Sequence, residues 1–238
     1  MAMQRQRGVR IPKASDLVVD AIRADVIDGK LAVGTRLESE TEMAERFGLG
    51  RVTVREALRL LERDGLVSIR RGPSGGIFVS NPDIRQVSEA LALLLRLRNT
   101  SLDDFAVFRL QVEPFVTELA AINATEGQRQ AILDIARQDR SAQHTADLHD
   151  LIAESSGNDL FEFTLKAMHV ALDTHFREER ISAADREVTR KAHERIAERI
   201  GERDAAGARA AMELHLLKYR EYLVASGLAY EPVLPPLN

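Results

Sequence analysis

Residues 48–66 read GLGRVTVREALRLLERDGL, and this stretch decides the fold. It has the pattern of a turn followed by one amphipathic helix, whose apolar stripe consists of Val54, Ala57, Leu58 and Leu61. On another face of the same helix an arginine recurs every four residues, at positions 51, 55, 59 and 63. Such a row of guanidinium groups can bind the phosphate backbone of DNA. A solvated arginine face on an ordinary amphipathic helix would have the same pattern.

A short helix is predicted directly before this stretch. Ser39 and Glu42 have the spacing of a capping box, in which each side chain accepts a hydrogen bond from the backbone N–H of the other residue. The apolar face that follows contains Met43 and Phe47, and Gly48 ends the helix because glycine adopts left-handed backbone at little cost. Two short helices joined by a glycine-containing turn indicate a helix-turn-helix.

After Gly65 the pattern changes from helical to strand-like. Residues 66–69 and 77–79 are apolar-rich segments on either side of a glycine-rich, doubly basic segment that contains Arg71 and Gly72. This pattern predicts a β-hairpin. A hairpin placed directly after a helix-turn-helix is the wing of a winged helix.

Composition excludes several classes of protein. The 238-residue chain contains no cysteine, which excludes disulfides, thiolate zinc sites and cysteine nucleophiles. The longest apolar runs are too short for a transmembrane helix, and the basic N-terminus lacks the apolar region of a signal peptide. We therefore expect a cytoplasmic protein with no membrane partner. Residues 1–80 carry 14 Lys and Arg against 11 Asp and Glu, whereas residues 81–238 carry 19 against 26, so a basic module precedes an acidic one.

From residue 84 onward the sequence has only helical periodicity. The predicted helices are 84–98, 101–123, 126–137, 140–155, 159–178, 183–201 and 204–226. The fold class is therefore mainly α: an N-terminal winged helix-turn-helix of three helices and a β-hairpin wing, then an all-α antiparallel bundle of six to seven helices. Ser15 is expected to cap the first helix. The predicted domains are a flexible arm at 1–14, the winged helix-turn-helix at 15–81, the helical domain at 82–228 and an extended proline-rich tail at 229–238.

Three segments of the first domain follow a known family pattern. They are Ser39-Glu40-x-Glu42-x-Ala44, Phe47-Gly48-x-x-Arg51-x-Thr53-Val54-Arg55-Glu56-Ala57-Leu58 and the wing segment that runs from Arg71-Gly72 to Gly76-x-Phe78-Val79. On these motifs, residues 26–79 resemble the N-terminal domain of the GntR superfamily of bacterial transcription regulators. Two positions depart from the pattern: Glu38 stands where proline is usual, and Gly50 stands where a serine usually caps the second helix.

The resemblance implies that the second helix enters the major groove of double-stranded DNA and that the wing tip reaches the minor groove. Arg51 and Arg55 fall in the first turns of this helix, where contacts with guanine are possible. Arg59 and Arg63 lie further along and are expected to contact the DNA backbone or solvent. The DNA-binding residues implied in this way are Arg51, Thr53, Arg55, Arg71, Gly72 and Thr41, the last at a position where relatives often carry a basic residue.

The helical domain follows a second family pattern. Its motifs are Arg109-x-x-x-Glu113, His149-x-x-Ile152-Ala153-x-x-x-Gly157-Asn158, Ala192-His193-x-x-Ile196 and Ala211-Met212-x-x-His215-Leu216. They resemble the effector domain of the FadR subgroup, often called FCD, in which many relatives bind a divalent metal through three histidines and one aspartate. The resemblance implies a Zn or Ni site at His149, His193 and His215. Thr145 replaces the expected aspartate, and Asp147 lies on a different helix face.

These residues also have structural alternatives. A single histidine on a half-apolar helix face is usually a packed or surface residue, and metal binding is favoured here only because three histidines stand at family positions. The remaining histidines, His144, His169 and His175, match no family position and are interpreted as ordinary. Arg109 lies among apolar residues, where an unpaired charge is costly to bury. It either pairs with Glu113 one turn later or binds the carboxylate of an effector.

We expect a ligand-responsive DNA-binding transcriptional regulator that is not an enzyme. It would act as a repressor, bind an inverted-repeat operator as a homodimer, and respond to a small carboxylate or other metabolite in the helical domain, with Arg109 as the effector-binding residue. One alternative is a metal-dependent hydrolase that uses the three histidines to activate water. Another is a metal-free sensor of an acyl or lipid-type ligand.

Overall fold

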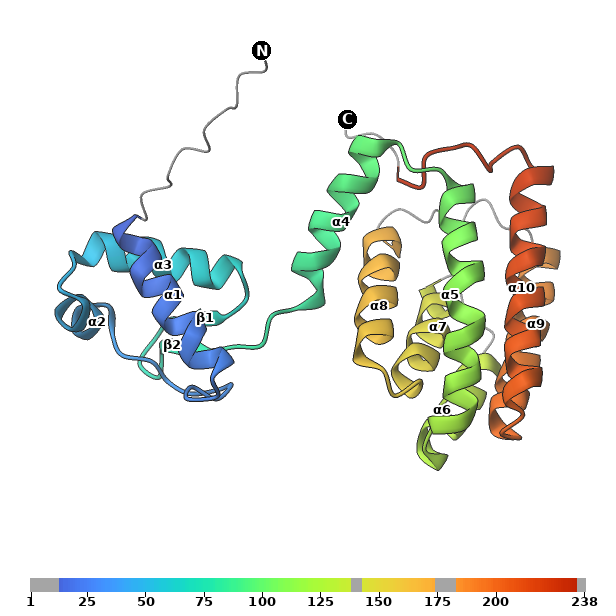
Figure 1. The fold of residues 1–238 in the computed structure, drawn as a ribbon, viewed down its shortest axis with the longest axis horizontal. Coiled ribbons are helices and arrows are strands. Elements are labelled where there is room, and N and C mark those ends of the chain that lie inside the picture. Colours follow the sequence, from blue (N-terminus) through green and yellow to red (C-terminus); the bar gives the residue numbers. More distant parts are fainter. Residues whose placement is uncertain (1–12, 138–142, 174–182, 235–238) are drawn as a thin grey trace, which may run out of the picture. The chain divides into compact units, whose positions relative to one another are not determined.

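The computed structural model describes residues 13–137, 143–173 and 183–234 (Figure 1). The chain separates into two compact units, Met1–Gln86 and Val87–Asn238. The described ranges leave out residues 1–12 of the predicted arm. They also leave out residues 174–178 of the helix predicted at 159–178, which include His175. Within those ranges no helix combines the length and the apolar character that crossing a membrane requires.

The described part of the first unit contains three helices and one β-hairpin. Its elements are α1 (Ala14–Ile27), α2 (Glu40–Phe47), α3 (Arg51–Arg63), β1 (Val67–Arg70) and β2 (Gly76–Val79). Helices α1 and α2 both pack against α3, and α1 crosses α3 in the view of Figure 1. The two strands are antiparallel, with Val67 opposite Val79 and Arg70 opposite Gly76. This arrangement is a winged helix-turn-helix, as the sequence predicts.

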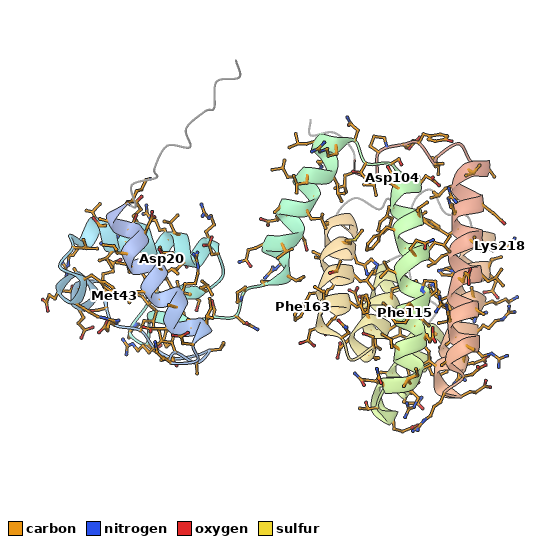
Figure 2. All side chains as sticks on the ribbon, in the orientation of Figure 1. Asp20, Met43, Asp104, Phe115, Phe163 and Lys218 are labelled. Atoms are coloured by element: carbon orange, nitrogen blue, oxygen red, sulfur yellow. The ribbon has the colours of Figure 1, made fainter. Side chains whose placement is uncertain are left out.

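The apolar stripe of α3 forms the centre of this unit. Val54, Ala57, Leu58 and Leu61 are each 0 % exposed. Met43 of α2, labelled in Figure 2, packs into the same cluster. Because these side chains fill one face of α3, the arginines that alternate with them are directed to the other face.

The joint between α2 and α3 forms as the sequence predicts. The backbone N–H of Ser39 donates to the Glu42 carboxylate at 2.7 Å, and the N–H of Glu42 donates to the Ser39 hydroxyl at 3.3 Å. Gly48 ends α2 with φ 65°, in the left-handed region that favours glycine. Gly50 is the N-cap of α3 and offers no side-chain hydrogen bond. The capping box and the glycine turn are therefore confirmed.

The predicted cap of the first helix is wrong. Helix α1 begins at Ala14, one residue before Ser15, and its N-cap is Lys13. The Asp16 carboxylate accepts a hydrogen bond from the Lys13 backbone N–H at 3.0 Å, which places the acidic residue, not the serine, in the capping role. Ser15 instead faces the interior and is 1 % exposed.

Removing the Ser39 hydroxyl is expected to destabilise the first unit modestly. Ser39→Ala should lower its free energy of unfolding by about 1 kcal/mol, because the Glu42 N–H loses its side-chain acceptor. Urea denaturation followed by circular dichroism measures the change. Ser74→Ala, the same substitution at an exposed position of the wing tip, is the control and should leave stability within about 0.5 kcal/mol of the wild type. Equal stability of both variants would contradict the capping role.

The described regular elements after the wing are all helices, and the first of them, α4, begins three residues before the boundary between the units. They are α4 (Ile84–Arg98), α5 (Leu102–Asn123), α6 (Glu126–Arg137), α7 (Gln143–Ser155), α8 (Asp159–Asp173), α9 (Ala183–Gly201) and α10 (Ala205–Ala225). Helices α5 and α10 lie side by side along their lengths, α9 packs on α10 and α6, and α7 packs on α8 and α5 (Figure 1). The helical bundle that the sequence predicts is confirmed.

Helix α5 is capped as its sequence indicates and carries an unusual buried face. The Asp104 N–H donates to the Ser101 hydroxyl at 3.0 Å. Most of the buried residues of α5 are apolar, but Arg109, Glu113 and Thr117 are also buried, at 8 %, 2 % and 0 % exposed. Buried charges need partners, so this polar face requires compensating groups within the bundle core.

Residues 229–234 return to the start of α5. The Leu102 N–H donates to the Glu231 carbonyl at 2.9 Å, and the Val233 N–H donates to the Thr100 carbonyl at 2.8 Å. Val233 and Leu234 are 7 % and 1 % exposed and pack in a cluster with Phe105. Residues 229–234 of the predicted tail therefore form part of the folded second unit.

Candidate functional site

The first candidate site is the exposed face of α3. Arg51, Arg55, Arg59 and Arg63 are all exposed, whereas Thr53 is half-buried. Since the opposite face of α3 fills the core, this row of guanidinium groups is available to a partner. The structure thus places the two predicted base-reading arginines on one surface, whereas Thr53, two residues from each of them, lies on a different side of the helix.

Two residues of α2 hold the first two arginines of α3. The Glu40 carboxylate accepts hydrogen bonds from Arg55, at 2.7 Å from Nη2 and 3.1 Å from Nε. The Arg51 guanidinium donates to the Thr41 hydroxyl. The hydrogen bond from Arg55 lowers the pKa of Glu40, so this carboxylate is ionised at neutral pH. Thr41, predicted as a DNA contact, therefore touches a DNA-reading candidate, and Glu40 is a participant that the sequence did not predict.

Val52 is a second residue that the sequence reasoning missed. It stands in the first turn of α3 and is 80 % exposed. An apolar side chain at this position of a recognition helix can contact the methyl group of thymine. The sequence did indicate that Val52 is exposed, because this valine lies outside the apolar stripe of α3.

The wing tip is open to solvent. Arg71 and Gly72 are both exposed, and Gly72 has φ 103°, a conformation that other residues rarely adopt. At the base of the tip, Arg36 donates a hydrogen bond to the Gly75 carbonyl at 3.2 Å. The wing carries two adjacent arginines, Arg70 and Arg71. The Arg70 guanidinium lies over the ring of Phe78, 4.7 Å from its centroid. Arg71 has no such ring contact in the described structure.

The second candidate site lies in the core of the helical unit. His149 of α7, His193 of α9 and His215 of α10 each present one ring nitrogen, and these three atoms lie within 4.8 Å of one another. The Nε2 atoms of His193 and His215 are 3.3 Å apart. His149 and His193 are 2 % and 6 % exposed, and His215 is half-buried. The structure therefore brings together the three histidines that the sequence singled out.

Arg109 and Glu113 of α5 lie directly beside this cluster. The Glu113 carboxylate accepts from Arg109 Nε at 2.5 Å, and its other oxygen lies 2.5 Å from His149 Nδ1. A carboxylate only accepts, so Nδ1 carries the hydrogen and the lone pair of His149 is on Nε2. Of the two roles predicted for Arg109, pairing with Glu113 is thus present in the structure.

Comparison with known proteins identifies the family of each of the two domains. A family described as "Bacterial regulatory proteins, gntR family" matches residues 14–79, and the "FCD domain" family matches residues 104–218. The HTH-type transcriptional repressor NanR of Citrobacter rodentium (strain ICC168) is 31% identical over 229 residues, which cover 89% of this chain and 86% of that protein. This chain belongs to the GntR family. Its FCD domain places it with the FadR-type regulators.

Two further relatives of this GntR regulator span most of the chain. The HTH-type transcriptional regulator LutR of Bacillus subtilis (strain 168) is 28% identical over 209 residues, covering 82% of this chain and 94% of that protein. The solved structure of Streptococcus agalactiae GntR has a TM-score of 0.61 and 23% identity, and covers 87% of this chain and 99% of that one. The latter similarity concerns the fold alone.

The histidines of this GntR regulator are suited to bind a cation. Burial lowers the pKa of His215 to about 3, and burial together with the neighbouring His215 holds the pKa of His193 well below its usual value. Burial also lowers the pKa of His149, although Glu113 opposes the shift. All three imidazoles are therefore neutral at neutral pH, which is the form that binds metal.

Among the described residues, the Glu113 carboxylate contacts the cluster, and Arg109 balances its negative charge. Burial alone would raise the pKa of Glu113, but Arg109 and His149 outweigh that effect and hold the pKa well below its usual value. Three neutral imidazole donors with converging nitrogens suit Zn or Ni, so the described residues fit such an ion. The side chain of Thr145, at the position where many relatives carry an aspartate, lies outside the described residues, as does that of His144. Asp147 is exposed.

His169 is not the ordinary residue that the sequence suggested. It is 7 % exposed, its Nδ1 lies 2.5 Å from an Asp150 carboxylate oxygen, and its Nε2 lies 3.9 Å from Glu113. Burial alone would lower its pKa, but the contacts with Asp150 and Glu113 raise it. His169 is therefore part of the polar network behind the three-histidine cluster. Its position could not be predicted because no family motif contains it.

Proposed function

We propose that this GntR regulator is a repressor that binds an inverted-repeat operator as a homodimer in the cytoplasm and releases it when a small carboxylate binds the FCD domain. The observation that carries the proposal is the convergence of His149, His193 and His215 in the core of a chain whose first unit exposes an arginine-lined helix. One domain has a surface for DNA, and the other has a polar interior for a ligand.

On the DNA side, the first turns of α3 would enter the major groove. Arg51 and Arg55 are then the candidates for reading guanine, and Val52 for contact with thymine. Thr53 and the helix N-terminus would contact phosphates, while Arg71 and Gly72 of the wing would approach the minor groove. The contact of Glu40 with Arg55 supports a directed role, because a carboxylate that binds one guanidinium restricts the orientations it can take.

On the effector side, His149, His193 and His215 would hold a divalent cation. When bound, this ion supplies a Lewis-acidic anchor for the oxygen atoms of an anionic ligand. Glu113 orients His149 through the Nδ1 hydrogen bond, and Arg109 keeps the carboxylate ionised. The polar lining of this region favours an organic acid over an acyl chain.

A homodimer is supported by exposed apolar side chains on α4. Leu93, Leu94 and Leu97 are 49 %, 58 % and 71 % exposed. A second copy of the chain would remove such a patch from water. Two-fold pairing would also double the base contacts of one winged helix, and a ligand that favours one dimer geometry would shift the population away from the DNA-bound form.

The proposal is tested by selecting duplexes from a random library with the purified full-length protein. An inverted repeat should be enriched, and its affinity should fall steeply as the salt concentration rises. A panel of small carboxylates, added with Zn²⁺, should include compounds that release the DNA. If no duplex is enriched and no salt-dependent binding is observed, the proposed DNA-binding function is contradicted. Hydrolysis of an added ester or amide that is lost in His193→Ala would instead favour the hydrolase alternative.

Replacing one arginine at each end of α3 separates base reading from undirected charge. Arg51→Ala should weaken binding to the selected operator by about 1–3 kcal/mol and relax the base preference at one position. Arg63→Ala, at the other end of the helix, should change affinity by no more than about 0.5 kcal/mol. Fluorescence anisotropy on operator and scrambled duplexes measures both effects. Equal losses on both duplexes from both variants would mean that the row of arginines provides only electrostatic attraction.

A further inference from the structure

The hydroxyl of Tyr219 is buried without a partner. Among the residues that the structure describes, it is one of three buried side-chain oxygens that have no hydrogen bond, and the other two belong to Ser15 and Ser155. A buried hydroxyl left unpaired is costly, so a native structure usually supplies an acceptor from the protein, from water or from a ligand. Burial raises the pKa of Tyr219, so this hydroxyl remains protonated and able to donate.

Tyr219 lies on the side of α10 that faces the three-histidine cluster. It follows His215 by four residues, which puts the two side chains on the same helix face one turn apart. The Arg109 guanidinium carbon is 5.7 Å from the centroid of the Tyr219 ring, and Arg109 Nη2 is 3.3 Å from His149 Nε2, the nitrogen with the lone pair. Arg109 therefore connects the ring of Tyr219 to the histidines, and this tyrosine borders the same polar region.

The charges of this region define the ligand that would suit it. Arg109 and Glu113 form an ion pair and cancel each other, and an imidazole that binds a metal is neutral. A divalent cation held by the histidines would therefore add two positive charges to a buried site. An anion with two negative charges balances them, whereas a monocarboxylate leaves half of the added charge unpaired.

Resting on the cation-dependent effector site proposed above, we propose that Tyr219 is an effector-binding residue whose hydroxyl donates a hydrogen bond to one carboxylate of a dicarboxylate ligand. The second carboxylate of that ligand binds at the three-histidine site. Tyr219 thereby distinguishes a dicarboxylate from a monocarboxylate of the same length. The ligand satisfies the hydroxyl that is unpaired without it.

The first test needs no effector. Tyr219→Phe removes the unpaired oxygen and keeps the ring that packs against Ala106 and Leu223. In zinc-free full-length protein the variant should melt about 2–5 °C above the wild type, because it no longer buries an unsatisfied group. Tyr230→Phe is the matched control: Tyr230 is 89 % exposed, and its loss of a hydroxyl should not change the melting temperature. A lower or unchanged melting temperature for Tyr219→Phe would show that the hydroxyl is satisfied structurally and would overturn the proposal.

The second test uses succinate and butyrate as probes, since they differ only by a carboxylate in place of a methyl group. Calorimetric titration into Zn²⁺-loaded wild type should give succinate binding at least about tenfold tighter than butyrate binding. In Tyr219→Phe this preference should fall by about tenfold, and in Tyr230→Phe it should persist. An undiminished preference in Tyr219→Phe, or no preference for succinate in the wild type, would overturn the proposal, and so would the absence of binding by either acid.

Failure of this inference is distinguishable from failure of the proposed function. Operator binding and zinc stoichiometry are measured on the same preparations before the acids are added. If the wild type binds DNA and zinc but Tyr219→Phe behaves as the wild type in both tests, only the role of Tyr219 is lost. If zinc does not bind, the cation-dependent effector site itself is contradicted.

Discussion

Glu113→Ala should lower the free energy of unfolding of the helical domain by about 3–5 kcal/mol, because it leaves the buried Arg109 guanidinium without its anionic partner. Glu113 is 2 % exposed and accepts hydrogen bonds from Arg109 and His149 at 2.5 Å each. Neither partner has another carboxylate at such a distance among the described residues. The cost is therefore that of an uncompensated buried charge and not of one lost surface ion pair. Urea denaturation followed by circular dichroism measures it.

A double variant separates this charge effect from simple loss of packing. Arg109→Met combined with Glu113→Leu removes both charges and keeps most of the side-chain volume. Its stability should lie well above that of Glu113→Ala and within about 1–2 kcal/mol of the wild type, because well-packed apolar residues often replace a buried ion pair without loss. If the double variant were as unstable as Glu113→Ala, the lost hydrogen bond to His149, and not the unpaired charge, would account for the instability.

His193→Ala should weaken the binding of Zn²⁺ by at least about 100-fold, since loss of a ligand costs more than loss of a group that only orients one. In the wild type, zinc at 1,000 times its dissociation constant should stabilise the protein by about 4 kcal/mol, and the variant should lose most of this gain at the same concentration. Competition with a chromophoric chelator gives the dissociation constants, and thermal unfolding with and without zinc gives the stabilisation.

Asp147→Ala is the matched control for the zinc experiment. Asp147 lies two residues from His149 but is exposed, so its loss should leave the dissociation constant unchanged within about twofold. A large loss in Asp147→Ala would assign the missing carboxylate ligand to this residue. Unchanged zinc binding in His193→Ala would refute the three-histidine site.

The winged helix could be predicted almost completely from local sequence, because its determinants act over a few residues. The capping box of Ser39 and Glu42 and the glycine that ends α2 are all local. The error at Ser15 has the same cause: Asp16 lies at capping distance from Lys13, and two adjacent polar residues competed for one role. Local rules do not decide such competition.

The candidate sites could be predicted only in part, because their contacts join residues that are far apart in the chain. The three histidines were found through a family motif, not through spacing. Glu40 and Arg55 are 15 residues apart, and His169 is 19 residues from Asp150. Packing of helices brings these groups together, and a single sequence carries no direct sign of it.

The backbone contacts between residues 229–234 and the start of α5 affect the order in which the two units can fold during synthesis. Every residue of the winged helix-turn-helix lies before position 80, so this unit can fold while the remainder is still being synthesised. The second unit, by contrast, pairs Thr100 with Val233, and that pairing cannot close until residue 233 has left the ribosome. We therefore expect a nascent regulator to gain its DNA-reading surface well before it gains a finished ligand domain. Contacts of such long sequence separation also slow folding, so the two abilities arise at different times after synthesis begins.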